Sequence, residues 1–394
     1  MSQPTLDPTA IVKECALDAG FDLVRVTSAD EFVRDRNAAL DRIKSGLMDG
    51  LPWYTESRVL RGADPGQLLE GARSVITLGL SYFTSGEPGS KSNESTPSGA
   101  MGKVARYARG RDYHKVMKSR MRDYVGALSS RLEAEMSARW YVDDGPMLDR
   151  AAAARSGLGW FGKNTNILTP SHGSWIFLGQ IITGLDLQPD APLEKTCGSC
   201  VRCIDACPTG AIVAPYVIDN ARCISHLTIE NRGPIPLELR PLIGDWVFGC
   251  DICQDVCPVN RKARPANAPI PNLPQTYRSE DDQSDLELDL VELLEMTEEG
   301  FRERFRGSPV ARAKRVGLQR NACVALGNRR DLTAVPALIK ALQTGEPLVR
   351  SHAAWALGEI GSLEAKTALR AALSTESDPE VATEIRAAIE IAAS

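Results

Sequence analysis

The sequence predicts a protein of three successive parts: a mixed α/β region, a compact cysteine-rich module and a C-terminal set of helical repeats. Three observations predict this order. Strand-forming runs alternate with helical periodicities before about residue 185. Eight of the ten cysteines lie between Cys197 and Cys257, and a short helical motif recurs near the C-terminus. We expect domains over residues 1–188, 189–262 and 308–394, with a linker and a helical segment over 263–307.

The first part combines helical and strand-like segments. Apolar residues recur at helical spacing over 8–20 and 113–136. Residues 85–101, rich in serine, glycine and proline, are expected to form a surface loop. Runs of strand-forming residues occupy 23–26, 74–82 and 175–182.

Composition restricts where the protein works and what its cysteines do. The formal net charge is -5, so no strong general attraction to nucleic acid is expected, although a mean charge can conceal a local basic patch. No apolar run approaches the length of a membrane span, and the N-terminus lacks the pattern of a secretory signal. We expect a cytoplasmic protein without a membrane partner, in which cysteines serve as metal ligands and not as disulfides.

The cysteines form two related motifs. The first, Cys197-Gly-Ser-Cys200-Val-Arg-Cys203-Ile-Asp-Ala-Cys207-Pro208, has the spacing of bacterial two-cluster ferredoxins. The second consists of Cys223 and, after an insertion, Cys250-Asp-Ile-Cys253-Gln-Asp-Val-Cys257-Pro258. In this pattern the last cysteine of each run binds the other cluster. The sequence therefore predicts two 4Fe–4S clusters in a ferredoxin-like module, one bound by Cys197, Cys200, Cys203 and Cys257, the other by Cys207, Cys223, Cys250 and Cys253.

A pair of zinc sites built from C-x2-C motifs is the alternative. Zinc needs neither four cysteines in one run nor a trailing proline, so the spacing favours iron–sulfur clusters. Cys15 and Cys323 lie outside the pattern and are expected to be buried, unreactive thiols. A two-cluster electron carrier needs only a small part of this chain. The electrons are therefore expected to reach a second cofactor or a substrate held by the first part.

The C-terminal repeat is visible as Ala325-Leu-Gly327, which recurs as Ala356-Leu-Gly358. Each unit is expected to contain two short helices, and Pro336 fits the first turn of such a helix. The pattern resembles HEAT-like repeats, which stack helix pairs because a single pair cannot bury its apolar face. We expect the units to dock on the preceding domain. An ordinary helical bundle is the alternative.

Five segments, in this order along the chain, carry a more specific resemblance. They are Arg106-Tyr-Ala-Arg-Gly-Arg-Asp-Tyr-His114, Tyr141-Val-Asp-Asp-Gly-Pro146, Gly157-Leu-Gly-Trp-Phe-Gly-Lys-Asn164, Cys207-Pro-Thr-Gly-Ala-Ile212 and Cys223-Ile-Ser-His-Leu-Thr-Ile-Glu230. Together they resemble the epoxyqueuosine reductase family, the cobalamin- and iron–sulfur-dependent enzymes of queuosine biosynthesis. The similarity extends over about residues 10–390. The Cys-Pro-Thr-Gly-Ala-Ile segment alone is common in ferredoxins, whereas the combination is specific.

The resemblance implies a fold and an activity. It implies a nitroreductase-like α/β domain that binds cobalamin, as cob(II)alamin at rest, followed by the two-cluster module and the repeats. The implied reaction is reduction of epoxyqueuosine to queuosine at the wobble position of tRNA, by a monomer that receives electrons from a low-potential flavodoxin- or ferredoxin-type donor. The alternatives are a corrinoid iron–sulfur reductive dehalogenase, against which the repeats and the absence of a twin-arginine signal count, and a non-catalytic electron carrier.

By the resemblance, Asp143 corresponds to the catalytic acid of the family's V-D-[ST]-[GA]-P motif. Conversion of an epoxide to an alkene and water consumes two electrons and two protons, and a carboxylic acid beside the leaving oxygen can supply a proton. Asp144 stands where the family usually has Ser or Thr, which adds a like charge beside Asp143. The alternatives are that Asp144 is the catalytic residue, or that Asp-Asp-Gly-Pro forms only a turn.

The resemblance also suggests cobalamin contacts. Tyr107 belongs to an aromatic and basic cluster ahead of a helix, for which a solvated helix start is the alternative. Lys163 and Asn164 follow a glycine-rich turn that could approach the corrin closely. Ser225 follows the cluster ligand Cys223 and is expected to border the gap between cluster and cofactor. The full predicted set is Arg61, Tyr107, Asp143, Lys163, Asn164 and Ser225.

Basic residues gather between residues 302 and 320. Binding of RNA phosphates needs such a patch. A solvated helix face beside an acidic linker is the alternative. The residues that we expect to contact tRNA are Arg302, Arg306, Arg312, Lys314 and Arg315.

Overall fold

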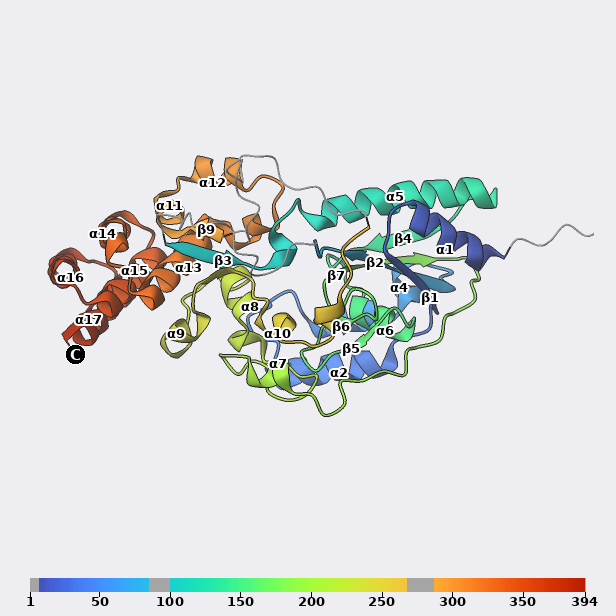
Figure 1. Ribbon diagram of the computed structural model, residues 1–394, viewed down its shortest axis with the longest axis horizontal. Helices are drawn as coiled ribbons and strands as arrows, with labels where there is room; N and C mark the ends of the chain where they lie inside the picture. The colour runs from blue at the N-terminus through green and yellow to red at the C-terminus, as the bar shows by residue number, and fades with distance from the viewer. Residues whose placement is uncertain (1–6, 85–99, 268–286, 394) are drawn as a thin grey trace, which may run out of the picture.

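Figure 1 shows an elongated molecule in which the predicted parts follow one another along the long axis. The computed structural model describes residues 7–84, 100–267 and 287–393. A sheet domain forms one end, the C-terminal helices form the other, and the cysteine-bearing segments lie between them (Figure 1). The predicted loop over 85–101 and the linker over 263–285 fall mostly outside the described residues. None of the helices in the described segments combines the length and apolarity that a membrane crossing requires.

The N-terminal domain is built on a four-stranded antiparallel sheet with the strand order β1-β2-β7-β4. The central strand β2 is buried along its whole length, as expected for a strand covered on both faces. The three predicted strands are confirmed, but β4 was missed because its four residues are only partly buried and show little alternation. The strands are β1 (Leu23–Ser28), β2 (Ser74–Ser81), β4 (Ala138–Tyr141) and β7 (Ile176–Thr183).

Helices cover both faces of this sheet. The two predicted helices, α1 (Pro8–Asp18) and α5 (Tyr113–Leu132), lie on one face, where Met117 and Tyr124 are fully buried. On the other face the alanine-rich helix α6 (Asp149–Arg155) packs against the sheet. The short side chains of α6 bring its backbone, and the loop before it, close to the strands. The domain also contains α2 (Val33–Lys44), α3 (Glu56–Ala63), α4 (Pro65–Leu68) and a hairpin of β5 (Trp160–Phe161) and β6 (Ile167–Leu168).

A second sheet joins segments from all parts that precede the repeats. Strand β3 (Met101–Val104) pairs in parallel with β8 (Trp246–Phe248) and antiparallel with β9 (Glu287–Asp289). Since these strands come from the predicted first domain, the cysteine module and the segment after the linker, the three parts share one hydrogen-bonded sheet. The cysteine module itself contains the short helices α7 (Arg202–Asp205), α8 (Ile224–Ile229), α9 (Arg240–Ile243) and α10 (Ile252–Asp255).

The helical segment that was expected after the linker, within residues 263–307, differs from that expectation. It begins with strand β9 and continues as α11 (Leu290–Glu295) and α12 (Glu298–Arg304). Asp289 explains the late start, because its carboxylate accepts the first backbone N–H groups of α11 and so caps the helix there. Thr297 caps α12 in the same way.

The C-terminal helices stack as the repeat predicted. The recurring glycines mark close helix contacts: a Cβ on Gly327 would lie 2.6 Å from the Trp355 ring, and one on Gly358 would lie 2.9 Å from the carbonyl oxygen of Ala388. Pro336 lies in the first turn of its helix, as predicted. The helices are α13 (Lys314–Arg329), α14 (Val335–Thr344), α15 (Pro347–Ile360), α16 (Leu363–Thr375) and α17 (Pro379–Ala393).

The repeats dock on the cysteine module, as expected. One apolar core runs continuously from Leu227 and Phe248 of the module to Leu318 of α13. Asn321 of α13 donates hydrogen bonds of 2.8 Å to backbone carbonyls on both α8 and β8. Buried polar groups thus fix the orientation of this apolar contact.

Candidate active site

The loop between β4 and α6 places Asp143 at the surface. Asp143 is exposed and has a φ of 54°, a left-handed conformation that is uncommon for a residue other than glycine. The base of the loop is tightly packed. A Cβ on Gly145 would lie 2.0 Å from the Tyr141 ring, and one on Gly62 of α3 would lie 1.7 Å from the carbonyl oxygen of Pro146. The loop therefore presents Asp143 outward from a close-packed base.

The two adjacent aspartates of this loop have different partners. Tyr113 of α5 donates a hydrogen bond of 2.9 Å from Oη to Asp143 Oδ2. Asp144 forms an ion pair with Lys118, also on α5, and accepts a hydrogen bond of 3.1 Å from Val142 N. Lys118 therefore compensates the charge of Asp144, and Asp143 is the carboxylate offered to the site.

Aromatic side chains form a wall behind Asp143. The Tyr113 ring stacks on Phe177 of β7, with centroids 4.1 Å apart and planes inclined by 5°. Tyr107 meets Tyr113 edge-on at 6.2 Å. Burial and then the negative charge of Asp143 raise the pKa of both tyrosines, so their hydroxyls stay protonated and can donate hydrogen bonds. A Cβ on Gly249, just before the second cysteine motif, would lie 3.4 Å from the Tyr107 ring, so the wall reaches the cysteine module.

Asp149, at the start of α6, is a residue of this site that the sequence analysis missed. Its Oδ1 atom is buried and has no hydrogen-bond partner within the described part of the chain. Burial and then the charge of Asp143 raise its pKa well above the usual range of an aspartate. The surroundings of Asp149 therefore favour the protonated form of its carboxyl group. The local sequence gives no sign of this burial.

The cysteines lie in two groups that combine both motifs. In the first group, Cys257 is close enough to Cys197 and Cys200 for their charges to add to the effect of burial, which is the main cause of its raised pKa. The pKa of Cys203 is raised by burial and then by Cys197, with a further contribution from Cys257. Cys257 of the second motif thus lies among three cysteines of the first.

In the second group, a cysteine of the first motif lies near cysteines of the second motif. Burial and then the charge of Cys223 raise the pKa of Cys253, and Cys207 of the first motif contributes as well. Burial, followed by effects that include Cys253 and Cys223, raises the pKa of Cys250. Cys203 of the first group also contributes to the pKa of Cys253, so the two groups lie close to each other, and ligation by each cysteine stays a prediction.

Lys163 and Asn164 lie at the tip of the β5–β6 hairpin and reach the two cysteine groups. Lys163 Nζ donates a hydrogen bond of 2.7 Å to the carbonyl oxygen of Gly198, between the first two cysteines. Asn164 Nδ2 donates one of 3.2 Å to the carbonyl oxygen of Cys253. Both side chains are buried. Their observed contacts are therefore with the cysteine loops, and their predicted contacts with cobalamin stay predictions.

The other predicted cobalamin residues lie at different depths. Ser225 is half-buried and lies close enough to Cys223 to oppose the larger effect of burial on the pKa of that cysteine. Arg61 is exposed on the last turn of α3, next to the glycine that packs on the loop of Asp143. The structure thus brings Tyr107 and Ser225 near the cysteines, and Arg61 near the aspartate loop.

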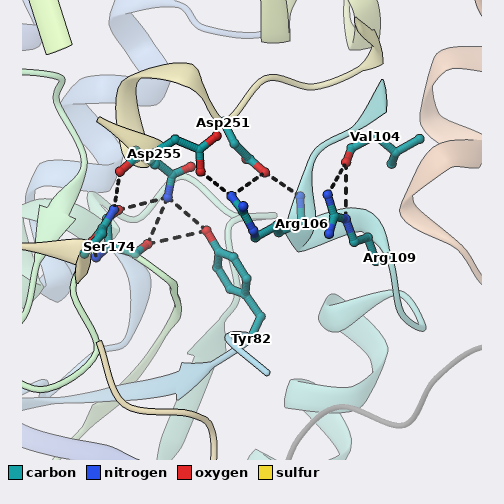
Figure 2. Close-up of polar contacts among 9 residues, drawn as sticks. Tyr82, Val104, Arg106, Arg109, Ser174, Asp251 and Asp255 are labelled. Carbon is teal, nitrogen blue, oxygen red and sulfur yellow. Dashed lines mark hydrogen bonds and ion pairs between the residues drawn. The ribbon is translucent and has the colours of Figure 1, made fainter. Parts of the chain in front are cut away.

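Arg106 connects the second cysteine motif to the N-terminal domain (Figure 2). Its backbone N–H donates a hydrogen bond of 2.7 Å to Asp251, and its guanidinium forms ion pairs with Asp251 and Asp255. The guanidinium also lies 4.7 Å from the centroid of the Trp175 ring. Burial raises the pKa of Asp251 to about 6, against the opposing effect of Arg106. This network fixes helix α10 and its cysteines against the sheet domain.

The predicted tRNA-binding residues differ in their surroundings. Arg302 and Arg315 pair with Glu298 at 3.0 and 3.2 Å. Arg312 donates two hydrogen bonds of 2.9 Å to a different acid, Glu230 of the cysteine module. These acids come from outside the basic run, so the run is less positive than its sequence indicates.

Arg312 is the member of the basic run that the structure brings to the site. Its hydrogen bonds to Glu230 are the main cause of its raised pKa, and the charge of Asp143 contributes. Its guanidinium therefore lies within electrostatic range of the aspartate loop. Lys314 and Arg306 are also exposed. Contact of all five predicted residues with tRNA stays a prediction.

The spacing of the eight cysteines and the acid-bearing loop of the sheet domain indicate an iron–sulfur oxidoreductase. Comparison with family models supports this class. Residues 196–260 match the 4Fe-4S double cluster binding domain, residues 310–390 match HEAT repeats, and residues 63–144 match the model described as Epoxyqueuosine reductase QueG, DUF1730. The match to a two-cluster module favours iron–sulfur clusters over the zinc alternative.

Curated and solved relatives cover nearly the whole chain. Epoxyqueuosine reductase of Escherichia coli (strain K12) is 37% identical, over 88% of each chain, and that of Pseudomonas aeruginosa is 39% identical, over 89% of this chain and 94% of the relative. A crystal structure of epoxyqueuosine reductase with a modified tRNA stem loop superposes with a TM-score of 0.87 at 32% identity, covering 98% of both chains. The chain belongs to the epoxyqueuosine reductase family, as the resemblance predicted.

Proposed function

We propose that this chain reduces epoxyqueuosine to queuosine at the wobble position of tRNA. The position of Asp143 carries the proposal. Asp143 is an exposed acid that accepts a hydrogen bond from Tyr113. The aromatic residues Tyr113 and Tyr107 connect it to the cysteine module. Two solved relatives support it. One holds an epoxyqueuosine-modified tRNA-Tyr stem loop, and the other, from Bacillus subtilis, has a catalytic loop with an aspartate swung out of the active site. An exposed acid on a short loop fits such a movement.

The surroundings of Asp143 suit a large, flat cofactor, and we propose that the N-terminal domain is the nitroreductase-like domain that binds cobalamin. Tyr107 is half-buried between the aspartate loop and the cysteine module and offers an aromatic ring for packing. When bound, cobalamin supplies a redox-active cobalt centre, with cob(II)alamin as the resting form. The side chains proposed to border it are Arg61, Tyr107, Asp143, Lys163, Asn164 and Ser225.

The protein's own acids account for the proton chemistry. The epoxide takes up two electrons and two protons to give an alkene and water. Asp143 delivers a proton to the epoxide oxygen as its bonds to carbon break. The hydrogen bond from Tyr113 keeps the Asp143 carboxyl in a fixed orientation. Asp149, whose raised pKa keeps it protonated, places a second acid behind the first.

The two cysteine groups suggest a direction for the electrons. The loop of Cys197 is at the surface, where Val201 is 41% exposed. Burial dominates the pKa of Cys223 and Cys253, whose group adjoins Tyr107 through Gly249. The outer cysteine group would therefore hold the cluster that accepts electrons from an external flavodoxin- or ferredoxin-type donor, and the inner group would hold the cluster nearer the active site.

The RNA approaches the site over the surface that carries Arg312, so that its phosphates meet the basic residues between 302 and 315. We further propose that the protein works as a monomer in the cytoplasm. The proposed approach of the RNA, the monomeric state and the cytoplasmic location rest on the sequence expectations and on the proposed substrate.

The direct test is an anaerobic assay of the reconstituted protein. The substrate is an anticodon stem loop that contains epoxyqueuosine, supplied with cobalamin and a low-potential reductant, and the nucleosides are identified by mass spectrometry. Formation of queuosine is expected only when iron–sulfur clusters and cobalamin are both present. Absence of queuosine from a preparation with full cluster and cobalamin content would overturn the proposed function. A protein that takes up electrons but not cobalamin would instead be an electron carrier.

A further inference from the structure

We propose that Lys163 and Asn164 tune the reduction potentials of the two clusters, one residue for each cluster. The hairpin tip that carries them lies between the two cysteine loops, and each side chain contacts a different loop. The inference rests on the proposed iron–sulfur clusters but not on the RNA substrate. It gives the hairpin a role in electron transfer separate from any contact with cobalamin.

Lys163 acts on the outer cysteine group. Its ammonium donates a hydrogen bond of 2.7 Å to the carbonyl oxygen of Gly198, and Gly198 lies between Cys197 and Cys200. The side chain of Lys163 is 9% exposed, so solvent screens its charge weakly. A buried positive charge beside a cluster favours the reduced form, which carries one more negative charge.

Asn164 acts on the inner cysteine group. Its Nδ2 donates a hydrogen bond of 3.2 Å to the carbonyl oxygen of Cys253. The orientation of this amide is fixed, because Asn164 Oδ1 accepts a hydrogen bond of 3.3 Å from Asn166 N. An N–H group directed at a cluster ligand stabilises the added negative charge of the reduced cluster.

The hairpin tip is rigid enough to hold both contacts at once. Gly162 N donates to the carbonyl oxygen of Asn166 at 2.7 Å, which closes the turn. Thr165 has a left-handed φ of 67°, and Arg150 of α6 donates to its carbonyl oxygen at 3.1 Å. A Cβ on Gly162 would lie 2.6 Å from Asn164 Oδ1, so this glycine leaves the space that the Asn164 side chain occupies. The same turn thus aligns two donors on two clusters.

The test is a potentiometric titration of the reconstituted protein, followed by electron paramagnetic resonance without any RNA. Lys163→Met is expected to shift one of the two midpoint potentials to a more negative value, and Asn164→Ala is expected to shift the other. Lys163→Arg keeps the positive charge, so the midpoint potential of this variant should stay close to the wild-type value. Asn166→Ala is the matched control, since its side chain takes no part in either contact, and it should leave both midpoints unchanged.

Iron content separates tuning from a purely structural role. Unchanged midpoints in Lys163→Met and Asn164→Ala proteins with full iron content would overturn the proposal. If Asn164→Ala loses a cluster, Asn164→Ser provides the second variant, and a retained cluster with a shifted midpoint would support tuning. Loss of the cluster in both Asn164 variants would assign the residue to structure alone and overturn the proposal. Because no RNA is present, failure of the reductase assay would not affect this result.

Discussion

Two pairs of adjacent polar residues, Asp143-Asp144 and Lys163-Asn164, differ in their exposure to solvent. Asp143-Asp144 and Lys163-Asn164 each adjoin a glycine in the sequence. Asp143 lies exposed on its loop in a left-handed conformation. Lys163 and Asn164 are only 9% and 4% exposed and are hydrogen-bonded between the two cysteine loops.

The difference in exposure suggests a separate function for each pair. An exposed acid on a loop can meet a substrate and can move, whereas two buried donors can act only on the groups that surround them. We therefore assign proton delivery to the aspartate loop and adjustment of the electron path to the hairpin tip. Variants of the two regions should separate these functions.

The largest expected effect is that of Asp143→Asn, which removes the proposed proton donor. Turnover of epoxyqueuosine should fall roughly 100- to 10,000-fold, the usual range for loss of a general acid. The midpoint potentials of the clusters should not change. Asp144→Asn is the control, because Asp144 pairs with Lys118, and it should retain turnover within about tenfold. Equal losses of turnover in both variants would show that Asp143 is not the specific proton donor.

Arg312→Gln should affect RNA binding more than chemistry. Its guanidinium lies on the proposed approach of the RNA, so the KM for the stem loop should rise roughly tenfold while kcat changes little. The slope of log affinity against log salt concentration should fall by about one. Arg302→Gln, which breaks only a pair with Glu298 on α12, should have a smaller effect. A fall in kcat without a change in KM would contradict this assignment.

Tyr113→Phe tests the support of the aspartate loop. The variant keeps the aromatic stack on Phe177 but loses the hydrogen bond to Asp143, so kcat should fall roughly 2- to 10-fold. Tyr124→Phe, on the same helix, removes a buried hydroxyl bonded to Val12 and should lower stability without lowering kcat. If the two variants had the same kcat, the role of the Tyr113 hydroxyl would be excluded.

The smallest expected effect concerns Asp149 and pH. Because its pKa is raised in the folded protein, its stabilising contribution is complete below the unfolded value of 3.8 and is lost as the pH rises through the folded value. The Asp149→Asn variant has no titrating group at this position, so it does not lose this stability as the pH rises. The melting temperature of the variant relative to wild type should therefore increase by up to a few degrees as the pH rises above 3.8. A difference that is independent of pH would show that Asp149 is not the titrating group.

Local patterns predicted the features that depend on neighbours in the sequence. The cysteine spacing predicted the two-cluster module that the family model matches, because the spacing within each run is itself the signature of such a module. The recurring Ala-Leu-Gly motif predicted the stacked helices, because a glycine permits the close approach seen at Gly327 and Gly358. The central strand β2 was predicted because it is apolar along its whole length.

Features that depend on distant partners were not predictable in this way. The burial of Asp149 and the acids that pair with Arg302 and Arg312 are set by tertiary contacts that leave no local pattern. Arg320 belongs to the basic run by sequence but is fully buried and donates to backbone carbonyls of the cysteine module. The contacts of Lys163 and Asn164 likewise appear only when two remote loops meet the hairpin.

The most direct test of the division of work compares wild type, Asp143→Asn and Asn164→Ala in two measurements on the same reconstituted samples. One is the midpoint potential of each cluster, and the other is the single-turnover rate of queuosine formation. The account predicts normal potentials with lost turnover for Asp143→Asn, and a shifted potential with a changed rate for Asn164→Ala. Shifted potentials in Asp143→Asn, or a changed rate with unshifted potentials in Asn164→Ala, would contradict it.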